Sequence, residues 1–491
     1  MVDIIASSTI PVPTEDESVK NWRTIREGGS RDVTVTAYLG SFETTGLESS
    51  RYHLTFTPES KVPDDDFVSL TYIDECDPTL VTIPQASLTL HLANGDGRYD
   101  ADNPDTLIGA FSIGRGIMLS ISATDGTVTA YKLFSVVAVT SVSYSGDEVI
   151  ITASDMSDLL ADRTFRCGSG FLTTLELLMM RLGPQCPLAM YSTNGEAVRN
   201  VTFSMQDINI QGAVLDAARM WAADDGTVVP MSVAINSSDP DGNLVSSETI
   251  INLMPYAVET EDIVRFEALI SRPAPMETPR YGSLTVDVTS SDGVVSVTED
   301  LSDFRNNLTV TASLFKNTTT EHNEGIQSYI ARAIKTHLNR ERWSMESECT
   351  PEIAPRVRIP VQGRWGWAVY DIVRHELTYD GSLTSRIEML KCDESEASAI
   401  IDTELTFTVS APGESFIISQ SDRTYCEDVT VNLGVPIIGF VPSTTSGTLK
   451  AGLSSNRITL NGIAVSGDTV QVIVKYQSQM IGVNLAFVKM G

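Results

Sequence analysis

Short strand-like segments recur along almost the whole chain, and this pattern limits the fold more than any other feature of the sequence. The segments are rich in Val, Ile, Thr and Tyr and are separated by Gly, Asp, Asn and Pro, which is typical of β-structure with tight turns. Examples are VTVTAYLG from Val33, KLFSVVAV from Lys132, EVIITAS from Glu148 and TVQVIVKY from Thr469. One hydrophobic core does not serve 491 residues, so the sequence predicts a mainly β protein with a few helices (α+β) and several domains.

The clearest hairpin is VRHELTYDGSLTSRIEML, from Val373 to Leu390. Asp380 and Gly381 supply its turn, because glycine tolerates the positive φ that a tight hairpin needs. Apolar and charged side chains alternate along both arms, so one face of this sheet is expected to contact water or a polar partner. The apolar residues are Val373, Leu377, Tyr379, Leu383, Ile387 and Met389, and the charged residues are Arg374, Glu376, Arg386 and Glu388.

Three segments show the spacing of amphipathic helices: Phe171–Leu182, Ile210–Ala222 and Gly325–Arg340. The exposed face of the third helix carries three basic residues, which we interpret as a solvated face rather than a nucleic-acid site. These residues are Arg332, Lys335 and Arg340.

Composition excludes several classes of function. The chain has 34 basic and 64 acidic residues, a formal net charge of −30, which opposes stable binding to nucleic acid and to anionic membranes. No apolar run approaches the roughly 20 residues that span a bilayer, and the N-terminus lacks the basic and apolar regions of a signal peptide. Six widely spaced cysteines without a CxxC pair indicate reduced thiols, as in a cytosolic chain.

Two acidic stretches partly match the pattern of calcium-binding loops. In LTLHLANGDGRYDADNP, from Leu88, a loop centred on Gly97 would place Leu92 and Asn103 at the first and last ligand positions, and neither is suitable. In SSDPDGNLVSSE, from Ser237, three acids occupy ligand positions, but the first position is neutral and a proline interrupts the loop. We interpret this stretch as a hairpin tip and expect no metal. The weak metal candidates are Asp239, Asp241 and Glu248.

Catalytic motifs are absent from the sequence. His375-Glu376 lacks the second histidine of a zincin helix, no Gly-x-Ser-x-Gly elbow occurs, and the glycine-rich pieces lack the lysine of a P-loop. Adjacent acids are expected by chance in so acidic a chain. We therefore expect no catalytic residues and no cofactor.

One internal repeat is visible. LTLHLANGDG at Leu88 and LTVDVTSSDG at Leu284 share Leu, Thr, Asp and Gly and keep the same alternation of apolar residues. The repeat predicts two related β domains, although strands that end in an Asp-Gly turn resemble one another in general.

The order of the segments resembles that of tail-tip and baseplate hub proteins of tailed bacteriophages, the tail-associated hub family. The resemblance covers about Arg31 to Lys391. It rests on ASLTLHLANGDGRYDADNP, IGAFSIGRGIMLSISA, VIITASDMSDLLADRTF, GAVLDAARMWAADDGTVVPMSV, YIARAIKTHLNRERW and HELTYDGSLTSRIEML, in this order. The acidic run after Leu88 would then be the loop that ends a tube-forming strand.

The resemblance implies a structural component of a phage tail tip. Such a hub ring closes or continues the tail tube and lets DNA pass, with roles in DNA ejection and host attachment and no enzymatic activity. Three chains, each with two tube-forming β-barrel-like domains, would form a homotrimer at the virion tail tip, assembled in the host bacterial cytoplasm. The implied partners are the distal tail ring, the tape measure and the tail fibres.

The resemblance and the soft boundaries of the sequence suggest five parts. They are an N-terminal arm (1–30), a first tube-like β domain (31–165), an α/β domain (166–265), a second tube-like β domain with a helix insertion (266–395) and a C-terminal β-sandwich-like domain (396–491).

A tail channel must pass DNA without holding it, and carboxylates on its wall would repel phosphates. Side chains alternate along a strand, so one face of LTVDVTSSDG would look into the channel. The expected lumen-facing residues are Thr285, Asp287 and Thr289, opposite Leu284, Val286 and Val288.

Alternative functions remain open. A distal tail ring usually has one tube domain and a peripheral lectin-like domain, and the second tube candidate argues against it. A tail-tip hydrolase would need a pocket with paired carboxylates or a metal. A receptor-binding module could use the C-terminal domain, which has neither heptads nor a catalytic motif and could dock a tail component or a glycan.

Overall fold

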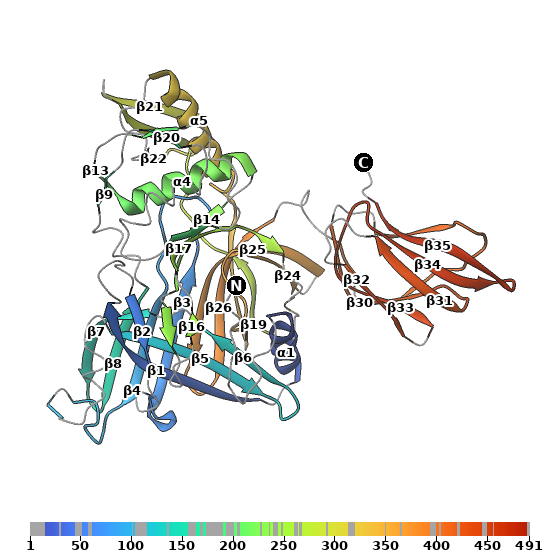
Figure 1. Cartoon of the computed structure of the whole chain (residues 1–491), viewed down its shortest axis with the longest axis horizontal. Coiled ribbons are helices and arrows are strands. Elements are labelled where there is room, and N and C mark those ends of the chain that lie inside the picture. Colours follow the sequence, from blue (N-terminus) through green and yellow to red (C-terminus); the bar gives the residue numbers. More distant parts are fainter. Residues whose placement is uncertain are drawn as a thin grey trace. The chain divides into compact units, whose positions relative to one another are not determined.

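The computed structural model describes most of the chain, in many segments. The described residues are 15–28, 31–44, 52–56, 61–100, 102–103, 115–134, 137–155, 164–166, 170–172, 190–192, 201–203, 207–225, 228–234, 236–238, 244–246, 249–259, 264, 268–290, 293–312, 320–348, 350–363, 366–392, 399–401, 404–419, 423–443, 449–454 and 456–488. As the sequence predicts, the protein is mainly β with a few helices and several separate sheets (Figure 1).

The chain forms two compact units. The first takes in Met1–Val258, Glu267–Val357 and Ile372–Leu390, and the second takes in Glu259–Phe266, Arg358–Asp371 and Lys391–Gly491. The five-part division expected from the sequence stays a prediction. Each unit is described separately.

A large sheet dominates the first unit. Its strands follow one another in the order β16 (Leu244–Ser246), β15 (Asn236–Ser238), β2 (Tyr52–Thr55), β1 (Asp32–Thr44), β5 (Gly116–Thr124), β7 (Val137–Ser145), β8 (Glu148–Ser154), β4 (Ser87–Ala93), β3 (Phe67–Glu75), β25 (Gly366–Tyr379), β26 (Leu383–Lys391), β23 (Arg342–Glu348) and β19 (Leu269–Pro275). β6 (Thr129–Leu133) pairs with β5. β3 and β25 pair in antiparallel fashion from Leu70↔Tyr379 to Glu75↔Arg374, so segments far apart in sequence share this sheet.

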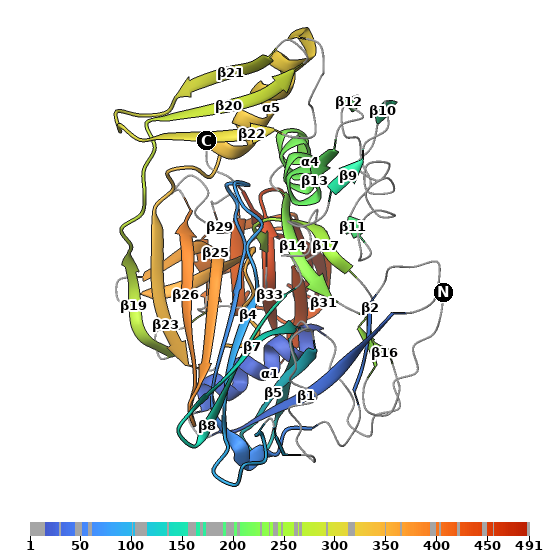
Figure 2. The same cartoon turned by 90° about the vertical axis from the view of Figure 1, so that its left-hand side faces the viewer.

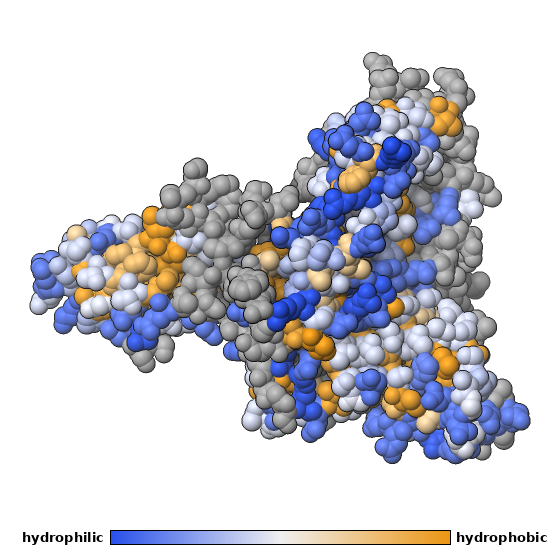
Figure 3. All heavy atoms as spheres, turned by 180° about the vertical axis from the view of Figure 1, so that it is seen from behind, coloured by the Kyte–Doolittle hydropathy of each residue, from blue (hydrophilic) through white to orange (hydrophobic). Residues whose placement is uncertain are grey.

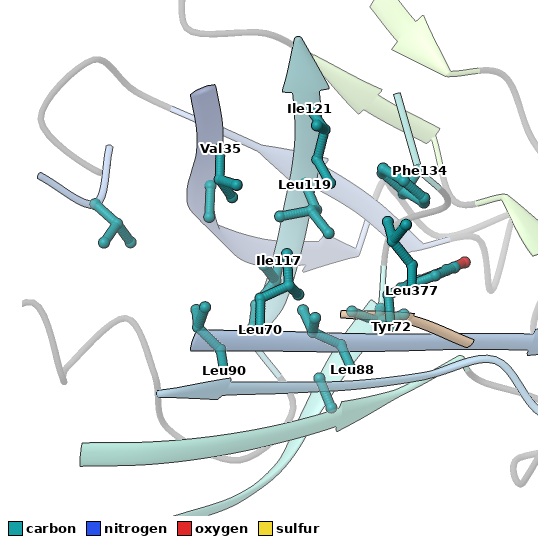
Figure 4. Packing of buried hydrophobic residues seen from close by; sticks show 14 of the residues in the cluster. Val35, Leu70, Tyr72, Leu88, Leu90, Ile117, Leu119, Ile121, Phe134 and Leu377 are labelled. Carbon is teal, nitrogen blue, oxygen red and sulfur yellow. The ribbon is translucent and has the colours of Figure 1, made fainter. Parts of the chain in front are cut away.

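The large sheet encloses its own hydrophobic core. β5 meets β7 at only two register positions, Gly116↔Ala138 and Ile117↔Val137. Figure 4 shows residues of β1 and β5, such as Val35 and Leu119, facing residues of β3 and β4, such as Leu70. Every second residue of a strand points to the same face of the sheet. The alternation of apolar and polar residues in the sequence therefore predicts which face is buried.

α1 (Glu15–Gly28) packs on this core. Trp22 and Ile25 are fully buried, and the indole Nε1 of Trp22 donates to the carbonyl of Tyr131 on β6 at 3.4 Å. Arg26 forms a buried ion pair with Glu352, with 2.5 Å between Nη1 and Oε1. The helix is thus fixed both to β6 and to the loop after β23.

Two further helices form layers in the first unit. The helix predicted from Ile210 is confirmed as α4 (Ile210–Asp225), and that predicted from Gly325 as α5 (Thr320–Lys335). α5 ends at Lys335, before the expected Arg340, and Asn339 then takes a positive φ of 68°. The helix predicted over Phe171–Leu182 lies outside the described residues, except for two residues in β10.

Small sheets accompany these helices (Figure 2). A sheet of β21 (Gly293–Asp300), β20 (Ser283–Ser290) and β22 (Asn307–Ala312), called the small sheet below, packs on α5. α4 lies between α5 and a sheet of β11 (Met190–Ser192), β17 (Thr249–Pro255) and β14 (Val228–Ala234). Two short pairs complete the unit: β10 (Gly170–Leu172) with β12 (Val201–Phe203), and β9 (Thr164–Arg166) with β13 (Asp207–Asn209). A 3-10 turn, η2 (Asp64–Asp66), precedes β3.

The second unit contains a β-sandwich, as expected for the C-terminal part. Its first sheet holds β27 (Ala399–Ile401), β28 (Leu405–Thr406), β30 (Arg423–Asn432), β33 (Arg457–Val465) and β32 (Lys450–Ser454). Its second sheet has the order β29 (Ser415–Ser419), β35 (Gln479–Phe487), β34 (Thr469–Tyr476) and β31 (Ile437–Ser443). One apolar core lies between the two sheets.

Residues outside the C-terminal segment complete the second unit. β24 (Val357–Gly363) pairs with the first half of β25 and, at its other edge, with β18 (Val258–Glu259). Val369 on β25 packs with Cys392, Tyr425 and Ile463 in a separate buried cluster. Arg358 and Asp371 form a two-point ion pair with distances of 2.6 and 3.2 Å.

The described residues contain no helix that is long and apolar enough to cross a membrane.

Candidate functional site

The outer face of the large sheet is a polar surface of the first unit. Leu88, Leu90 and Leu92 of β4 are fully buried in the core. Ser87, Thr89 and His91 alternate with them and therefore lie on the opposite face, partly exposed. We call this side of β25, β3, β4, β8 and β7 the outer face.

One line of residues on the outer face carries hydroxyl groups on all five strands. Register pairs join Thr378 to Thr71, Thr71 to Thr89, Thr89 to Thr152 and Thr152 to Ser141. We call these five residues the hydroxyl row. The Ser141 and Thr152 hydroxyl groups are hydrogen-bonded, and the hydroxyl of Thr140, at a bulge in β7, donates to the carbonyl of Thr152 at 3.1 Å. The row is thus an ordered, uncharged strip across strands of two distant segments.

Charged residues flank the hydroxyl row in opposite-sign groups. On the side of β8, His91 Nδ1 lies 3.3 Å from Glu148 Oε2. On the side of β25, Arg374 contacts Glu376 at 3.0 Å and Glu388 at 3.2 Å, and Glu388 also lies 3.7 Å from Arg342. The hairpin predicted from Val373 is present, with its turn at Gly381 in a positive φ of 99°. Three of its four charged residues, Arg374, Glu376 and Glu388, form ion pairs, and Arg386 is exposed.

The acidic loop after β4 is held by its own hydrogen bonds. Asn94 Nδ2 donates to Asp100 Oδ1 at 2.7 Å, and the amide of Tyr99 donates to Asn94 Oδ1 at 2.7 Å. Gly97 takes a positive φ of 70° at the turn, where a Cβ would lie 2.8 Å from Asp100 Oδ2. The carboxylate of Asp100 therefore serves the turn, which agrees with the prediction of a strand-ending loop.

A second carboxylate, from η2, ties this loop to the entry of β3. Asp66 Oδ2 accepts the Tyr99 hydroxyl at 2.6 Å and Arg98 Nη1 at 2.9 Å. Burial, followed by the bond to Asp66, raises the pKa of the Tyr99 phenol above its ordinary value, so the phenol stays a donor.

Buried titratable groups lie on the inner side of β3 and β25. Desolvation, with the Asp155 carboxylate as the next cause, raises the pKa of Asp74 to about 6. His375, paired in register with Asp74, is buried, and desolvation lowers its pKa to about 3. Its Nε2 lies 2.9 Å from the Ser385 hydroxyl. The imidazole of His375 is therefore neutral, hydrogen-bonded to Ser385 and shielded from solvent, so we interpret it as a core group rather than a catalytic base.

The weak metal candidates Asp239, Asp241 and Glu248 lie outside the described residues, so their assignment stays a prediction. Among the residues that the structure describes, no group of three or more His, Cys, Asp or Glu side chains could hold a metal ion.

The expected lumen-facing residues lie on β20, in the centre of the small sheet. Leu284, Val286 and Val288 are fully buried on the helix side, which confirms the predicted alternation. On the other side, Thr285 Oγ1 lies 2.9 Å from Thr298 Oγ1 and donates to Asn307 Oδ1 at 3.2 Å. Asp287 stands in register between Ser296 and Thr311. The backbone of Thr289 continues this strand, and its side chain lies outside the described residues.

The alternation of buried and exposed residues can be read from the sequence, whereas the hydroxyl row and the hydrogen bonds of Asp66 cannot. Both depend on register: Thr71 and Thr378 become neighbours only through the β3–β25 pairing. The sole local signal was the repeated placement of Thr or Ser between buried residues.

No protein-family model matches the chain, and no curated protein matches it. Solved structures do. A tail protein from Neisseria meningitidis MC58 has a TM-score of 0.43 and 10% identity, covering 74% of this chain and 97% of its own. The 43 kDa tail protein of prophage MuSo2 from Shewanella oneidensis has a TM-score of 0.40 and 12% identity, and the match covers 73% of this chain and 98% of that protein. The prophage tail protein gp18 from Listeria monocytogenes EGD-e has a TM-score of 0.39 and 12% identity, and the match covers 74% of this chain and 95% of that protein.

All three are tail proteins, the class that the order of the sequence segments resembles. Identities of 10–12% and TM-scores below 0.5 transfer no residue role to this chain.

Proposed function

We propose that the chain is a structural component of a phage tail tip, a hub subunit whose ring continues the tail tube and lets DNA pass. The observation that carries the proposal is the hydroxyl row on the outer face of the large sheet. Protein affinity for DNA comes mainly from Lys and Arg that replace counterions at phosphates. A strip of five hydroxyl groups, with Arg374 beside it already paired to Glu376 and Glu388, offers phosphates little attraction.

The open side of the small sheet supports the same role. Its register positions hold Ser283, Thr285 and Asp287 on β20, with Ser, Thr and Asp on β21 and Asn and Thr on β22, and none of these positions is basic. The net charge of −30 adds a repulsive field. We assign Thr285, Asp287 and Thr289 to the channel wall on this basis.

Ring closure by three copies is also part of the proposal. Two tube-forming regions in each of three chains would match a sixfold tube. β19, at one end of the large sheet, carries Pro273 and Pro275, which block further strand addition, so closure would use other surfaces. The distal tail ring, the tape measure and the tail fibres are the proposed partners, at a tail tip assembled in the host cytoplasm. A structural role needs no catalysis.

The test is an image of the assembled tail tip together with a charge-insertion variant. We expect three copies of the chain with the hydroxyl row facing the channel. Phage carrying both Thr89→Lys and Thr152→Lys should still assemble. These phage should eject DNA more slowly than the wild type, most of all at low salt, because the two lysines would bind passing phosphates. Thr430→Lys on the sandwich adds the same kind of charge elsewhere and should leave ejection unchanged.

Two results would contradict the proposal. A channel lined mainly by Lys and Arg would exclude the hub assignment. Six copies per tail would favour the distal tail ring instead.

A further inference from the structure

A strand edge is one way in which another polypeptide could bind the first unit. On the face that Figure 3 shows, apolar residues of this unit are scattered among polar ones. A strand edge does not need an apolar patch, because its unpaired N–H and C=O groups can bond to almost any extended segment. β6 has such an edge, since among the described residues it pairs with β5 alone. We call the side of β6 that lies away from β5 the β6 edge.

Alternate residues of β6 face this edge. Directly after the strand, the amide of Phe134 donates to the Leu119 carbonyl of β5 at 2.9 Å. In an antiparallel pair the N–H and C=O groups of one residue point to the same side, and those of the next residue point to the opposite side. Thr129, Tyr131 and Leu133 therefore turn their main-chain groups toward the β6 edge.

α1 occupies the β6 edge with side-chain donors (Figure 1). Asn21 Nδ2 donates to the Thr129 carbonyl at 3.2 Å, and Trp22 Nε1 donates to the Tyr131 carbonyl at 3.4 Å. These two carbonyls are two positions apart, which is the spacing at which a neighbouring strand would bond. The helix thus takes the place that a further strand would need.

Core packing and two ion pairs hold α1 in this place. Ile25 is fully buried in the core of the large sheet. Arg26 pairs with Glu352, and Arg31, just before β1, pairs with Glu348 at the end of β23. The helix is therefore held against the β6 edge by contacts that do not involve β6.

The sequence of β6 offers the edge no protection of its own. The strand contains neither proline nor acid, and its one lysine, Lys132, shares the side of the buried Ala130. β19, at an end of the same sheet, instead carries Pro273 and Pro275. An uncovered β6 would therefore accept an extended segment through its main chain.

We propose that α1 is an autoinhibitory cover of the β6 edge. While α1 is docked, the two carbonyls are occupied and no strand of another polypeptide pairs with β6. When α1 undocks, an extended segment of a second polypeptide pairs with β6 through main-chain hydrogen bonds, with little demand on its sequence. In a pure preparation that polypeptide is another copy of the chain. The inference rests on the contacts of α1 and not on the proposed function, which the image of the tail tip tests separately.

The experiment is sedimentation velocity of the full chain over a wide concentration range, with Asn21→Ala and Trp22→Ala combined in one variant. This double variant loses both donors to the β6 edge and should associate at concentrations at least about tenfold lower than the wild type. The matched control is Leu92→Ala, which truncates a fully buried side chain of the same core on β4, a strand that is paired on both sides. The control should sediment like the wild type. Circular dichroism checks that every variant is folded.

A rescue variant separates an open edge from a weakened core. The N–H of Tyr131 faces the β6 edge, so Tyr131→Pro removes a donor that strand addition needs and leaves the bonds to β5 in place. Added to the double variant, Tyr131→Pro should restore the sedimentation of the wild type. On its own, Tyr131→Pro should change nothing.

Three results would overturn the inference. A folded double variant that sediments like the wild type at every concentration means that α1 does not keep the edge closed. Equal association of Leu92→Ala means that a weakened core, and not an open edge, brings the chains together. Association that persists after Tyr131→Pro is added means that the chains meet at another surface.

Discussion

Asp100 shows what an acidic residue of the run after β4 does: its carboxylate accepts a hydrogen bond from Asn94 in the same loop. Asp66, from η2 before β3, accepts hydrogen bonds from Arg98 and Tyr99 of that loop. A charge run in a sequence does not reveal which acids are occupied in this way. Here the run stabilises the end of a strand.

Asp74 gives the first prediction at this scale. Desolvation and the Asp155 carboxylate raise its folded-state pKa to about 6, from 3.8. The folded chain therefore takes up this proton before the unfolded chain as the pH falls, so Asp74 destabilises the fold most above pH 6 and progressively less toward pH 4. Asp74→Asn should raise the free energy of unfolding at neutral pH by on the order of 1–3 kcal/mol. This stabilisation relative to the wild type should disappear as the pH falls toward 4.

Urea unfolding between pH 4 and pH 8 measures both effects. Asp125→Asn is the control of opposite sign, because hydrogen bonds from Val128 and Thr127 lower the pKa of Asp125. Its carboxylate stabilises the fold at neutral pH, and that contribution is lost as the pH falls through the lowered value. Equal pH profiles for wild type and Asp74→Asn would contradict the assignment.

At the scale of elements, the small sheet depends on a close backbone contact at Gly282, just before β20. The carbonyl of Gly282 accepts the amides of Leu301 and Ser302, and a Cβ on Gly282 would lie 1.6 Å from the carbonyl oxygen of Phe304. No shift of a flexible side chain can relieve a clash with main chain.

Gly282→Ala should therefore lower the free energy of unfolding by about 2 kcal/mol or more. The loss should appear first as faster amide hydrogen exchange in β20, β21 and β22. Gly452→Ala on β32 is the matched control, because a Cβ there would meet nothing within 4 Å. A small sheet with unchanged exchange in Gly282→Ala would mean that the 301–306 loop can move aside.

Elements and their faces could be predicted from the sequence, whereas their partners could not. α4, the hairpin turn at Gly381 and the inward side of β20 follow from local periodicity and turn chemistry. The two similar segments at Leu88 and Leu284 nevertheless pair differently, since β4 lies between β3 and β8 and β20 between β21 and β22. Alternation fixes which face is buried, and long-range register decides which strand is next. The hydroxyl row belongs to the second kind of information.

At the scale of the whole molecule, the second unit is built from three separate stretches of chain. The sandwich begins after the acidic CDESEAS segment, yet its unit includes Arg358–Asp371. Tyr425 and Ile463 of the sandwich pack with Val369 and Cys392. Removing the C-terminal residues would therefore uncover part of this cluster.

A fragment that ends at residue 395 should keep the fold of the large sheet but expose the thiol of Cys392. The residue Cys392 is 6% exposed in the full chain, and Cys76, which is 4% exposed, packs within the first unit. Alkylation mapped by mass spectrometry should label Cys392 in the fragment and not in the full chain, with Cys76 protected in both. Labelling of Cys76 in the fragment would instead mean that the first unit cannot fold without the sandwich.

The pairing of β3 with β25 also has a consequence in time. β3 cannot acquire this neighbour until residues about 300 positions later have been made. At ribosomal rates of roughly 5–20 residues per second, the delay is on the order of 15–60 seconds. Throughout that interval the nascent chain displays a strand edge that other chains could capture. Production of this protein should therefore depend on chaperones that hold the emerging N-terminal half until translation reaches β25.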